Sequence, residues 1–306
     1  MLVNLNEILY KARKGHYAVG HFNTSNLEIT QAIIDGAKEL NSPVIIGVSE
    51  KALIYAGIFQ IAGIIRGLAE NVDIPIVIHL DHGKDFELIK ECIKAGFTSV
   101  MFDGSALPFE ENLKLTKKIV SYAHKMDISV EAEIGKLSGI EDDTHSEMNI
   151  YTDPEEARIF AEESGCDALA IAIGTSHGAY KFKGKPRLRI DILKEIADRV
   201  KIPLVLHGAS GVKQKWVNYA NRFGAKIEKT SGVPDRLIKQ AIKNGIAKIN
   251  VDTDIRIAFT AGIREYLTKH PEVFDPREIL ARPRGMVKEV IKERIILFGS
   301  AGVWLH

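Results

Sequence analysis

Residues 74–102 read IPIVIHLDHGKDFELIKECIKAGFTSVMF. The apolar run Ile74–Leu80 has the length and β-branched content of a buried strand. Phe86–Ala95 has the 3.6-residue period of an amphipathic helix, and Phe97–Phe102 is a second apolar run. A strand, a helix and a strand in this order predict two parallel strands joined by a right-handed crossover, which is the unit of an α/β protein.

The same alternation extends over the rest of the chain. Further apolar runs are Tyr17–Phe22, Pro43–Val48, Ile128–Ile134, Asp167–Ile173, Ile202–His207 and Gly245–Val251. Segments with helical periodicity are Leu27–Leu40, Glu110–Met126, Pro154–Ser164 and Ile190–Val200. Eight strands alternating with helices predict a (β/α)8 TIM barrel. A doubly wound open sheet is the structural alternative, because a count of short runs can err by one strand.

Residues 1–306 are expected to form a single catalytic barrel domain, because no Gly/Ser linker, low-complexity run or repeat divides them. Two segments exceed normal loop length, Gly135–Thr152 and Gly208–Pro234, and such loops are often lids or binding elements. Within the second of them, Lys213–Phe223 is expected to be helical. After the last strand, Ile255–Thr268 is expected to be the eighth barrel helix and Pro276–Leu297 a C-terminal helical extension.

Charge and composition limit the partners. Lys and Arg number 41 against 40 Asp and Glu, so no bulk field attracts nucleic acid or an anionic membrane, and an anionic ligand must be held in a local pocket. Cys92 and Cys166 have no partner at metal spacing and are expected to be buried thiols. Met1–Lys14 lacks the pattern of an export signal, and no apolar run reaches about 18 residues, which predicts a cytoplasmic protein.

Three histidines stand where apolar runs end. His82, His177 and His207 are each followed by glycine, and in a barrel the carboxyl ends of all strands open on one face. Three imidazoles that converge there, with a fourth position open, are typical of a catalytic zinc site. His79 is expected to lie deeper, in the barrel interior. The other histidines are expected to be structural or solvated: His16, His21, His124, His145, His270 and His306.

Small and polar residues follow the sixth, seventh and eighth strands. Gly178 and the segment His207–Gly211 permit close approach of backbone N–H groups to a phosphate. The eighth strand ends in Asn250-Val251-Asp252-Thr253-Asp254, which adds short polar side chains to the same face. Ordinary turns and helix capping are the alternatives for these residues.

Together, the segments 80–83 (LDHG), 172–178 (AIGTSHG), 207–211 (HGASG) and 250–256 (NVDTDIR) resemble the class II fructose-1,6-bisphosphate aldolases. The likeness extends from Asn23 to Asp275–Glu278, and is greatest to the bacterial class IIB subgroup and its thermophile members. The resemblance implies a lyase of glycolysis and gluconeogenesis that reversibly cleaves fructose 1,6-bisphosphate into dihydroxyacetone phosphate and glyceraldehyde 3-phosphate.

The resemblance also implies roles at the metal. His82, His177 and His207 match zinc ligands, and zinc there polarises the ketose carbonyl and stabilises the enediolate. Cobalt is expected to replace zinc, and a monovalent cation, Na⁺ or K⁺, is left open as a second cofactor. Two acid–base residues are implied, Asp81 for the C4 hydroxyl proton and Glu141 for the dihydroxyacetone phosphate proton. Carboxylates that match an alternative metal position are Asp103 and Glu133.

Substrate contacts carried over from the family fall into four groups. Those for the C1 phosphate are Gly178, Lys181, Gly208, Ser210 and Thr253; those for hydroxyls are Asn250 and Asp252; those that line the pocket are Asn23 and Ser49; those for the far phosphate are Arg256 and Arg277. Arg277 could come from the same chain or from a neighbouring subunit. A homodimer or homotetramer is expected.

Three residues depart from the family pattern. Lys84, Asp85 and His21 replace small residues and are expected to alter the electrostatics of the rim.

Other functions are alternatives to the fructose-bisphosphate aldolase. A tagatose-1,6-bisphosphate aldolase is the nearest rival, and Lys248 on the eighth strand is the residue that a Schiff-base aldolase would need. A zinc hydrolase is disfavoured because the first strand lacks a His-x-His pair. A metal-binding scaffold without activity does not account for carboxylates and a phosphate loop on one face.

Overall fold

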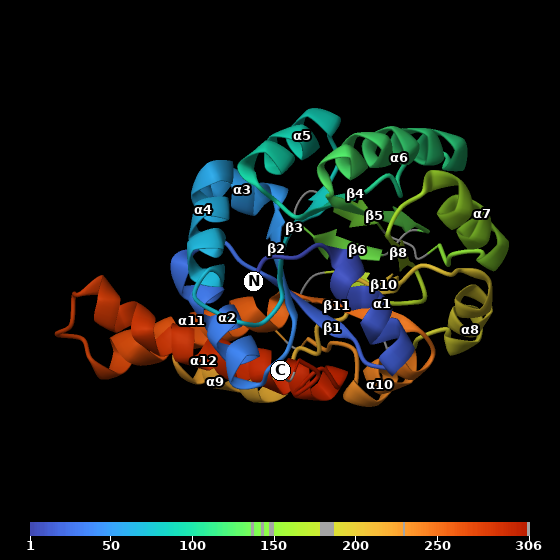
Figure 1. Ribbon diagram of the computed structural model, residues 1–306. Coiled ribbons are helices and arrows are strands. Elements are labelled where there is room, and N and C mark those ends of the chain that lie inside the picture. Colours follow the sequence, from blue (N-terminus) through green and yellow to red (C-terminus); the bar gives the residue numbers. More distant parts are fainter. Residues whose placement is uncertain (136–137, 142–143, 147–149, 178–186, 229, 305–306) are drawn as a thin grey trace.

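The computed structural model of the protein describes residues 1–135, 138–141, 144–146, 150–177, 187–228 and 230–304, and of 138–141, 144–146 and 177 the backbone alone. Within these residues eight parallel strands close into a barrel, in the order β1-β11-β10-β8-β5-β4-β3-β2 (Figure 1). Their bounds are β1 Val19–Asn23, β2 Val44–Ser49, β3 Ile76–Gly83, β4 Ser99–Phe102, β5 Ser129–Ile134, β8 Ala168–Ile171, β10 Leu204–Leu206 and β11 Ile246–Val251. Each overlaps one predicted run, so the barrel prediction is confirmed and the open sheet is excluded.

Helices surround the barrel (Figure 1). The predicted ones are α2 Leu27–Glu39, α5 Phe86–Ala95, α6 Phe109–Ala123 with the 3₁₀ turn η1 His124–Met126, α7 Pro154–Ser164, α8 Ile190–Arg199, α9 Gln214–Arg222, α11 Thr253–Lys269 and α12 Pro276–Phe298. Helices not predicted as such are α1 Leu5–Gly15, α3 Glu50–Ala56, α4 Ile58–Ala69 and α10 Asp235–Lys243. No single described helix is long and apolar enough to span a membrane; α3 and α4, bent by 92°, meet that criterion only as a pair.

The helix α5 shows how local sequence fixes an element. Asp85 precedes it and its carboxylate accepts a hydrogen bond from the amide of Leu88, which satisfies one of the free amides of the first turn. Ile89 and Cys92 lie on the buried face, against the barrel. Burial of each such side chain contributes about 1.5–3 kcal/mol, so the amphipathic period alone is enough to orient the helix.

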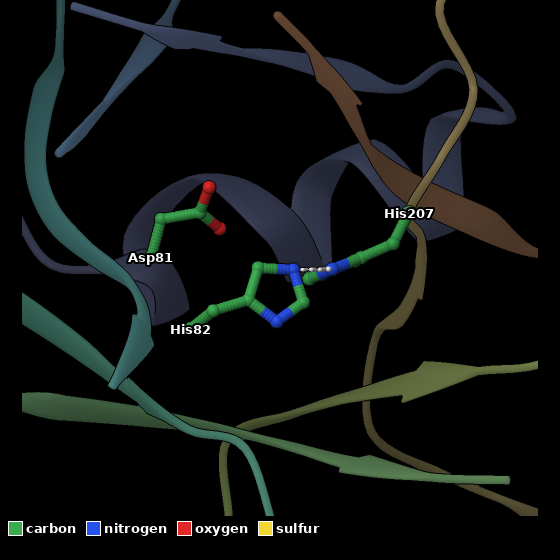
Figure 2. Close-up of side chains that lie close together, drawn as sticks. All are labelled: Asp81, His82 and His207. Carbon is green, nitrogen blue, oxygen red and sulfur yellow. Dashed lines mark hydrogen bonds between the residues drawn. The ribbon is translucent and has the colours of Figure 1, made fainter. Parts of the chain in front are cut away.

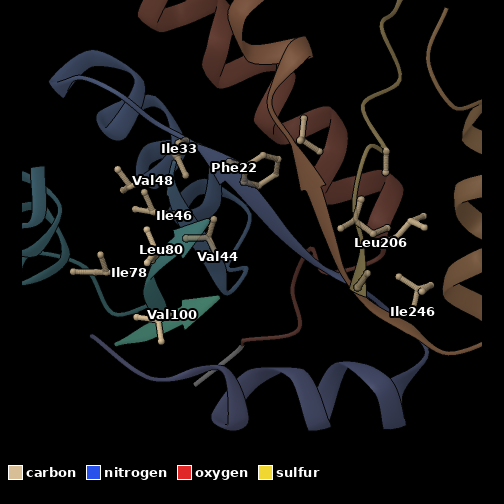
Figure 3. Close-up of a cluster of buried hydrophobic side chains, with 14 of the residues drawn as sticks. Phe22, Ile33, Val44, Ile46, Val48, Ile78, Leu80, Val100, Leu206 and Ile246 are labelled. Carbon is tan, nitrogen blue, oxygen red and sulfur yellow. The ribbon is translucent and has the colours of Figure 1, made fainter. Parts of the chain in front are cut away.

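The apolar core has an outer layer and an inner layer. On the outer layer, strand residues such as Ile46, Ile78 and Leu80 pack against the surrounding helices (Figure 3). Within the inner layer, residues of alternate parity, such as Val77, pack inside the barrel against α1. Because the amide of Val3 donates to the carbonyl of Ile76, at the start of β3, the segment leading into α1 closes the amino-terminal end of the barrel.

Two further strand segments lie beyond the carboxyl ends of the barrel strands. They are β6 Ser138–Glu141 and β7 Thr144–Ser146. In a separate sheet, β6 pairs with β7 on one side and with the short β9 Ser176–His177 on the other. The last two helices form an arm that extends away from the barrel (Figure 1). The helix α12 returns along this arm and packs on α11 and α2.

Candidate active site and metal centre

Strand β3 carries three polar residues into the barrel. His79 and Asp81 share the inward parity of Val77 and are buried. His82 has a positive φ of 53°, a conformation that costs a non-glycine residue about 1–3 kcal/mol. The pairing of β3 with β4 shifts register between Leu80 and Gly83, as at a β-bulge. The bulge lets two consecutive side chains, those of Asp81 and His82, lie at the mouth of the barrel.

His82 and His207 face each other across the mouth of the barrel. The Nε2 atom of His82 lies 2.8 Å from the Nδ1 atom of His207, and the rings are edge to face (Figure 2). The other ring nitrogen of each histidine meets a carboxylate: Asp103 lies 2.8 Å from Nδ1 of His82, and Glu131 lies 2.8 Å from Nε2 of His207. Since the outer ring nitrogens of both histidines face carboxylates, the inner nitrogens are the ones that would present lone pairs to a metal, as in metal-ligating histidines.

The charges around the two histidines favour a cation between them. Burial opposes the protonation of His82, but the charges of Asp81 and Asp103 raise its pKa to about 10. Burial instead lowers the pKa of His207. His82 is therefore the histidine that carries the proton between the two facing nitrogens. A divalent metal fits the same donor set, and Asp81, His82 and His207 offer ligand atoms within 4.8 Å of one another.

A second group that fits a metal lies beside the first. His82, Asp103 and Glu133 also offer ligand atoms within 4.8 Å of one another. The Oε2 atom of Glu133 is buried without a hydrogen-bond partner and lies 3.7 Å from the nearest nitrogen of both His82 and His207. Burial and the charge of Asp103 raise the pKa of Glu133 well above its ordinary value. An orphaned buried carboxylate of this kind is the ligand that a second cation position requires.

Asp81 is held by two amides. The side chain of Asn23 donates to one carboxylate oxygen at 2.8 Å, and that of Asn250 donates to the other at 3.1 Å. Burial opposes ionisation, but the neighbouring His21 and His82 hold the pKa of Asp81 well below its ordinary value. The group is therefore an ionised carboxylate beside the two histidines (Figure 2), which suits a general base. Asn23, expected to line the pocket, and Asn250, expected to contact substrate hydroxyls, both donate to Asp81.

Glu131 is the functional residue that the sequence reading missed. It is fully buried, and besides His207 it contacts the Lys248 ammonium group at 2.9 Å and lies 3.7 Å from His79. The alternation of Ser129, Glu131 and Glu133 on one strand face was the available signal. Lys248 also donates to Asn250 at 2.8 Å, so its side-chain nitrogen contacts two acceptors. This contact argues against the Schiff-base alternative.

His21 lies inside the barrel, so the expectation that it alters the electrostatics of the rim is wrong. Strand alternation places His21 two residues below Asn23 on the inward face, where it is fully buried with its ring 5.3 Å from that of His79. It therefore does not act on the rim. Asp85 caps α5, and the amide of Lys84 donates to Glu50.

Three of the residues expected to hold a phosphate, Gly208, Ser210 and Thr253, follow the carboxyl ends of β10 and β11. Gly208 has φ 60°, and a Cβ atom there would lie 2.6 Å from the carbonyl oxygen of Ser176, so only glycine fits. The hydroxyl of Ser210 accepts a hydrogen bond from the amide of Asp252 at 3.3 Å. Thr253 begins the 17-residue helix α11, whose amino end favours an anion.

Three other residues expected to contact substrate, Ser49, Arg256 and Arg277, each interact with another residue of the protein. Ser49 caps α3, accepting from the amide of Ala52, which is the role of a structural residue. Arg256 forms an ion pair with Asp252 at 2.7 Å. Arg277 is 89% exposed, pairs with Asp275, and lies on the arm beyond α11, whose 17 residues span about 25 Å. The structure therefore does not bring Arg277 to the mouth of its own barrel.

Gly178 and Lys181 lie outside the described residues, as do the side chains of Glu141 and His177. The described backbone does bring two of their segments together, because Gly139 of β6 pairs with His177 of β9.

A parallel barrel with facing histidines and ionised carboxylates at its carboxyl end defines a metal-dependent barrel enzyme. Residues 3–303 match the family model described as fructose-bisphosphate aldolase class-II. The chain belongs to the class II fructose-bisphosphate aldolase family. As a member it is a lyase of a metal-dependent class.

Known proteins agree with this assignment. A fructose-bisphosphate aldolase of Thermus caldophilus is 50% identical over 304 residues, which cover 99% of both chains. One of Helicobacter pylori (strain ATCC 700392 / 26695) is 45% identical and covers 98% of this chain and 99% of its own. The solved YdjI aldolase from Escherichia coli K12 superposes with a TM-score of 0.82 at 35% identity, covering 99% of each chain.

Proposed function

We propose that this chain reversibly cleaves fructose 1,6-bisphosphate to dihydroxyacetone phosphate and glyceraldehyde 3-phosphate. The observation that carries the proposal is the facing pair His82 and His207 with the ionised Asp81 beside it. Relatives that carry this activity in their names match nearly the whole chain. Residues 1–306 would form one catalytic domain in the cytoplasm.

The metal would be zinc, held by His82, His207 and, as third ligand, His177. When bound, a divalent metal there supplies Lewis-acid polarisation of the substrate's ketose carbonyl. Asp103 and Glu131 orient the two described ligands through the outer ring nitrogens, and Glu133 lies close enough to offer a second position. Cobalt should replace zinc, and a monovalent cation, Na⁺ or K⁺, remains a proposal.

Asp81 would remove the proton of the C4 hydroxyl as the C3–C4 bond breaks, releasing the aldehyde product. Asn23 and Asn250 hold its two oxygens and so fix its direction. The carbon left on the dihydroxyacetone phosphate half must then receive a proton, and Glu141 would deliver it. The pairing of β6, which carries Glu141, with β9 supports this assignment, since it links that segment to the histidine end of the barrel.

Substrate phosphates would bind at two ends of the site. Gly208, Ser210 and Thr253 would hold the C1 phosphate, aided by the glycine and lysine at positions 178 and 181. Asn250 and Asp252 would meet substrate hydroxyls, and Arg256, freed from Asp252, would meet the far phosphate. The exposed position of Arg277 on the arm suits a residue given to a second copy of the chain, in a homodimer or homotetramer.

One assay tests the proposal. Purified protein is given fructose 1,6-bisphosphate or tagatose 1,6-bisphosphate, with and without chelator, and triose phosphate release is measured. Cleavage should favour the fructose epimer, stop in chelator and return with zinc or cobalt. Full activity in chelator with a borohydride-trapped lysine adduct would refute the metal mechanism, and a preference for tagatose 1,6-bisphosphate would refute the substrate.

A further inference from the structure

Arg294 of α12 is a buried charge that the proposed reaction does not use. Its side chain is 3% exposed. One guanidinium nitrogen lies 2.9 Å from the carboxylate of Asp254, which is itself 2% exposed, and another lies 3.2 Å from that of Asp235 at the start of α10. A buried arginine is costly to desolvate unless its partners are well placed, so its position here calls for a specific reason.

The guanidinium group lies against Gly211, the last residue of the segment Gly208–Gly211. A Cβ atom at Gly211 would overlap Arg294, so the arginine occupies the space that a side chain would fill. The carboxylate of Asp254 that pairs with Arg294 also accepts the amide of Gly211 at 3.0 Å. One carboxylate oxygen therefore connects the segment to the amino end of α11 and to the C-terminal helix α12.

The connection also places the charge of Asp254 beside the segment proposed to bind the C1 phosphate. Asp254 places a negative charge two residues after Asp252 and against the last residue of the segment proposed to bind the C1 phosphate. A bound phosphate carries the same sign, and the repulsion is strong where both groups are removed from water. Arg294 neutralises that carboxylate and keeps it in place as an acceptor for Gly211.

We propose that Arg294 is a positioning residue for phosphate binding: through Asp254 it holds the Gly208–Gly211 segment and cancels a charge that would repel the C1 phosphate. The inference rests on the proposed aldolase function. Arg294 itself does not touch substrate. The C-terminal helix is thus part of the phosphate site of its own barrel.

The test measures condensation by the zinc-loaded full-length enzyme, where the two substrates report separately. In Arg294→Met, KM for dihydroxyacetone phosphate should rise about tenfold, because an unpaired buried charge is left beside the phosphate. KM for glyceraldehyde 3-phosphate and bound zinc should be unchanged, and Arg294→Lys should recover part of the loss. Arg284→Met is the matched control, since Arg284 is also an α12 arginine with an acid partner, Asp35, on α2.

A second variant keeps the test decisive if Arg294→Met folds poorly. Asp254→Asn combined with Arg294→Met removes both charges and leaves an amide oxygen that can accept from Gly211, so the double variant should bind dihydroxyacetone phosphate better than the single one. Equal rises in KM for both trioses, or a double variant no better than the single, would overturn the proposal. A wild-type enzyme without aldolase activity would instead refute the proposed function.

Discussion

The inside of the barrel consists of two halves built from the same strands. Toward the amino ends, inward residues such as Val77 are apolar and pack against α1. Two and four residues further along the same strand, His79 and Asp81 occupy equivalent inward positions and are charged or polar. Strand geometry fixes the face toward which each side chain points. The position along the strand determines whether an inward residue is apolar or polar. The lower half therefore stabilises the fold and the upper half binds and reacts.

The largest effect is expected from Asp81 in the upper half. Asp81→Ala should lower kcat by about 10²–10⁴, because a general base is removed. The metal content should stay the same, since the two histidines keep their supporting carboxylates. Rates and bound zinc measured on the same sample give the test, and a variant with more than half the wild-type rate would show that the assignment is wrong.

The opposite behaviour is expected in the lower half. Leu9 of α1 is fully buried against the inward apolar residues. Leu9→Ala should reduce the free energy of unfolding by about 2–5 kcal/mol through the cavity it leaves, with kcat unchanged at temperatures where the variant is folded. Urea unfolding and steady-state kinetics check this, with the exposed Tyr10→Ala as control. Loss of kcat without loss of stability would break the division between the halves.

Glu131 lies at the boundary between the two halves, and its substitution tests whether a residue at this depth still affects metal binding. Glu131→Gln should weaken zinc binding by about 10–100-fold, because the group that fixes the ring of His207 and pairs with Lys248 loses its charge. Competition with a chromophoric chelator measures the affinity. Glu162→Gln, on the surface of α7, is the control. Unchanged affinity would mean that Glu131 only balances the charge of Lys248.

The smallest effect of a single step, about tenfold in zinc affinity for each pH unit, is expected from pH. Zinc must displace the proton that His82 holds, and the pKa of His82 in the metal-free protein is raised to about 10. The protonated form therefore persists through neutral pH, and zinc affinity should rise about tenfold per pH unit up to that value, one proton being released. Affinity measured between pH 6 and pH 8 in a buffer that does not bind zinc is the test. A flat profile would show that no ligand proton is displaced.

Sequence reasoning predicted the strands and, of the three histidines expected at strand ends, the location of His82 and His207, for a physical reason. Apolar runs that end in His-Gly mark both a buried strand and its exit, so His82 and His207 could be located without coordinates. Glu131 could not be recognised in this way, because it lies inside a run and its partner Lys248 is 117 residues away. The position of Arg277 depends on the direction of the arm, which periodicity does not encode.

Other errors have local causes. Helix α4 is apolar on most of its surface and contains two glycines, which weakens its helical period. The effect of His21 on the rim was expected because it replaces a small residue of the family pattern, whereas alternation along β1 places it below Asn23. In both cases the missing information was depth in the fold, which is a tertiary property.

The central claim is a metal held between His82 and His207, and anomalous diffraction at the zinc edge tests it most directly. Crystals of the zinc-loaded protein should show one strong peak between Nε2 of His82 and Nδ1 of His207, with His177 as the third ligand. Any weaker peak should lie toward Asp103 and Glu133. A zinc-loaded, active enzyme with no peak between the two histidines would contradict the account.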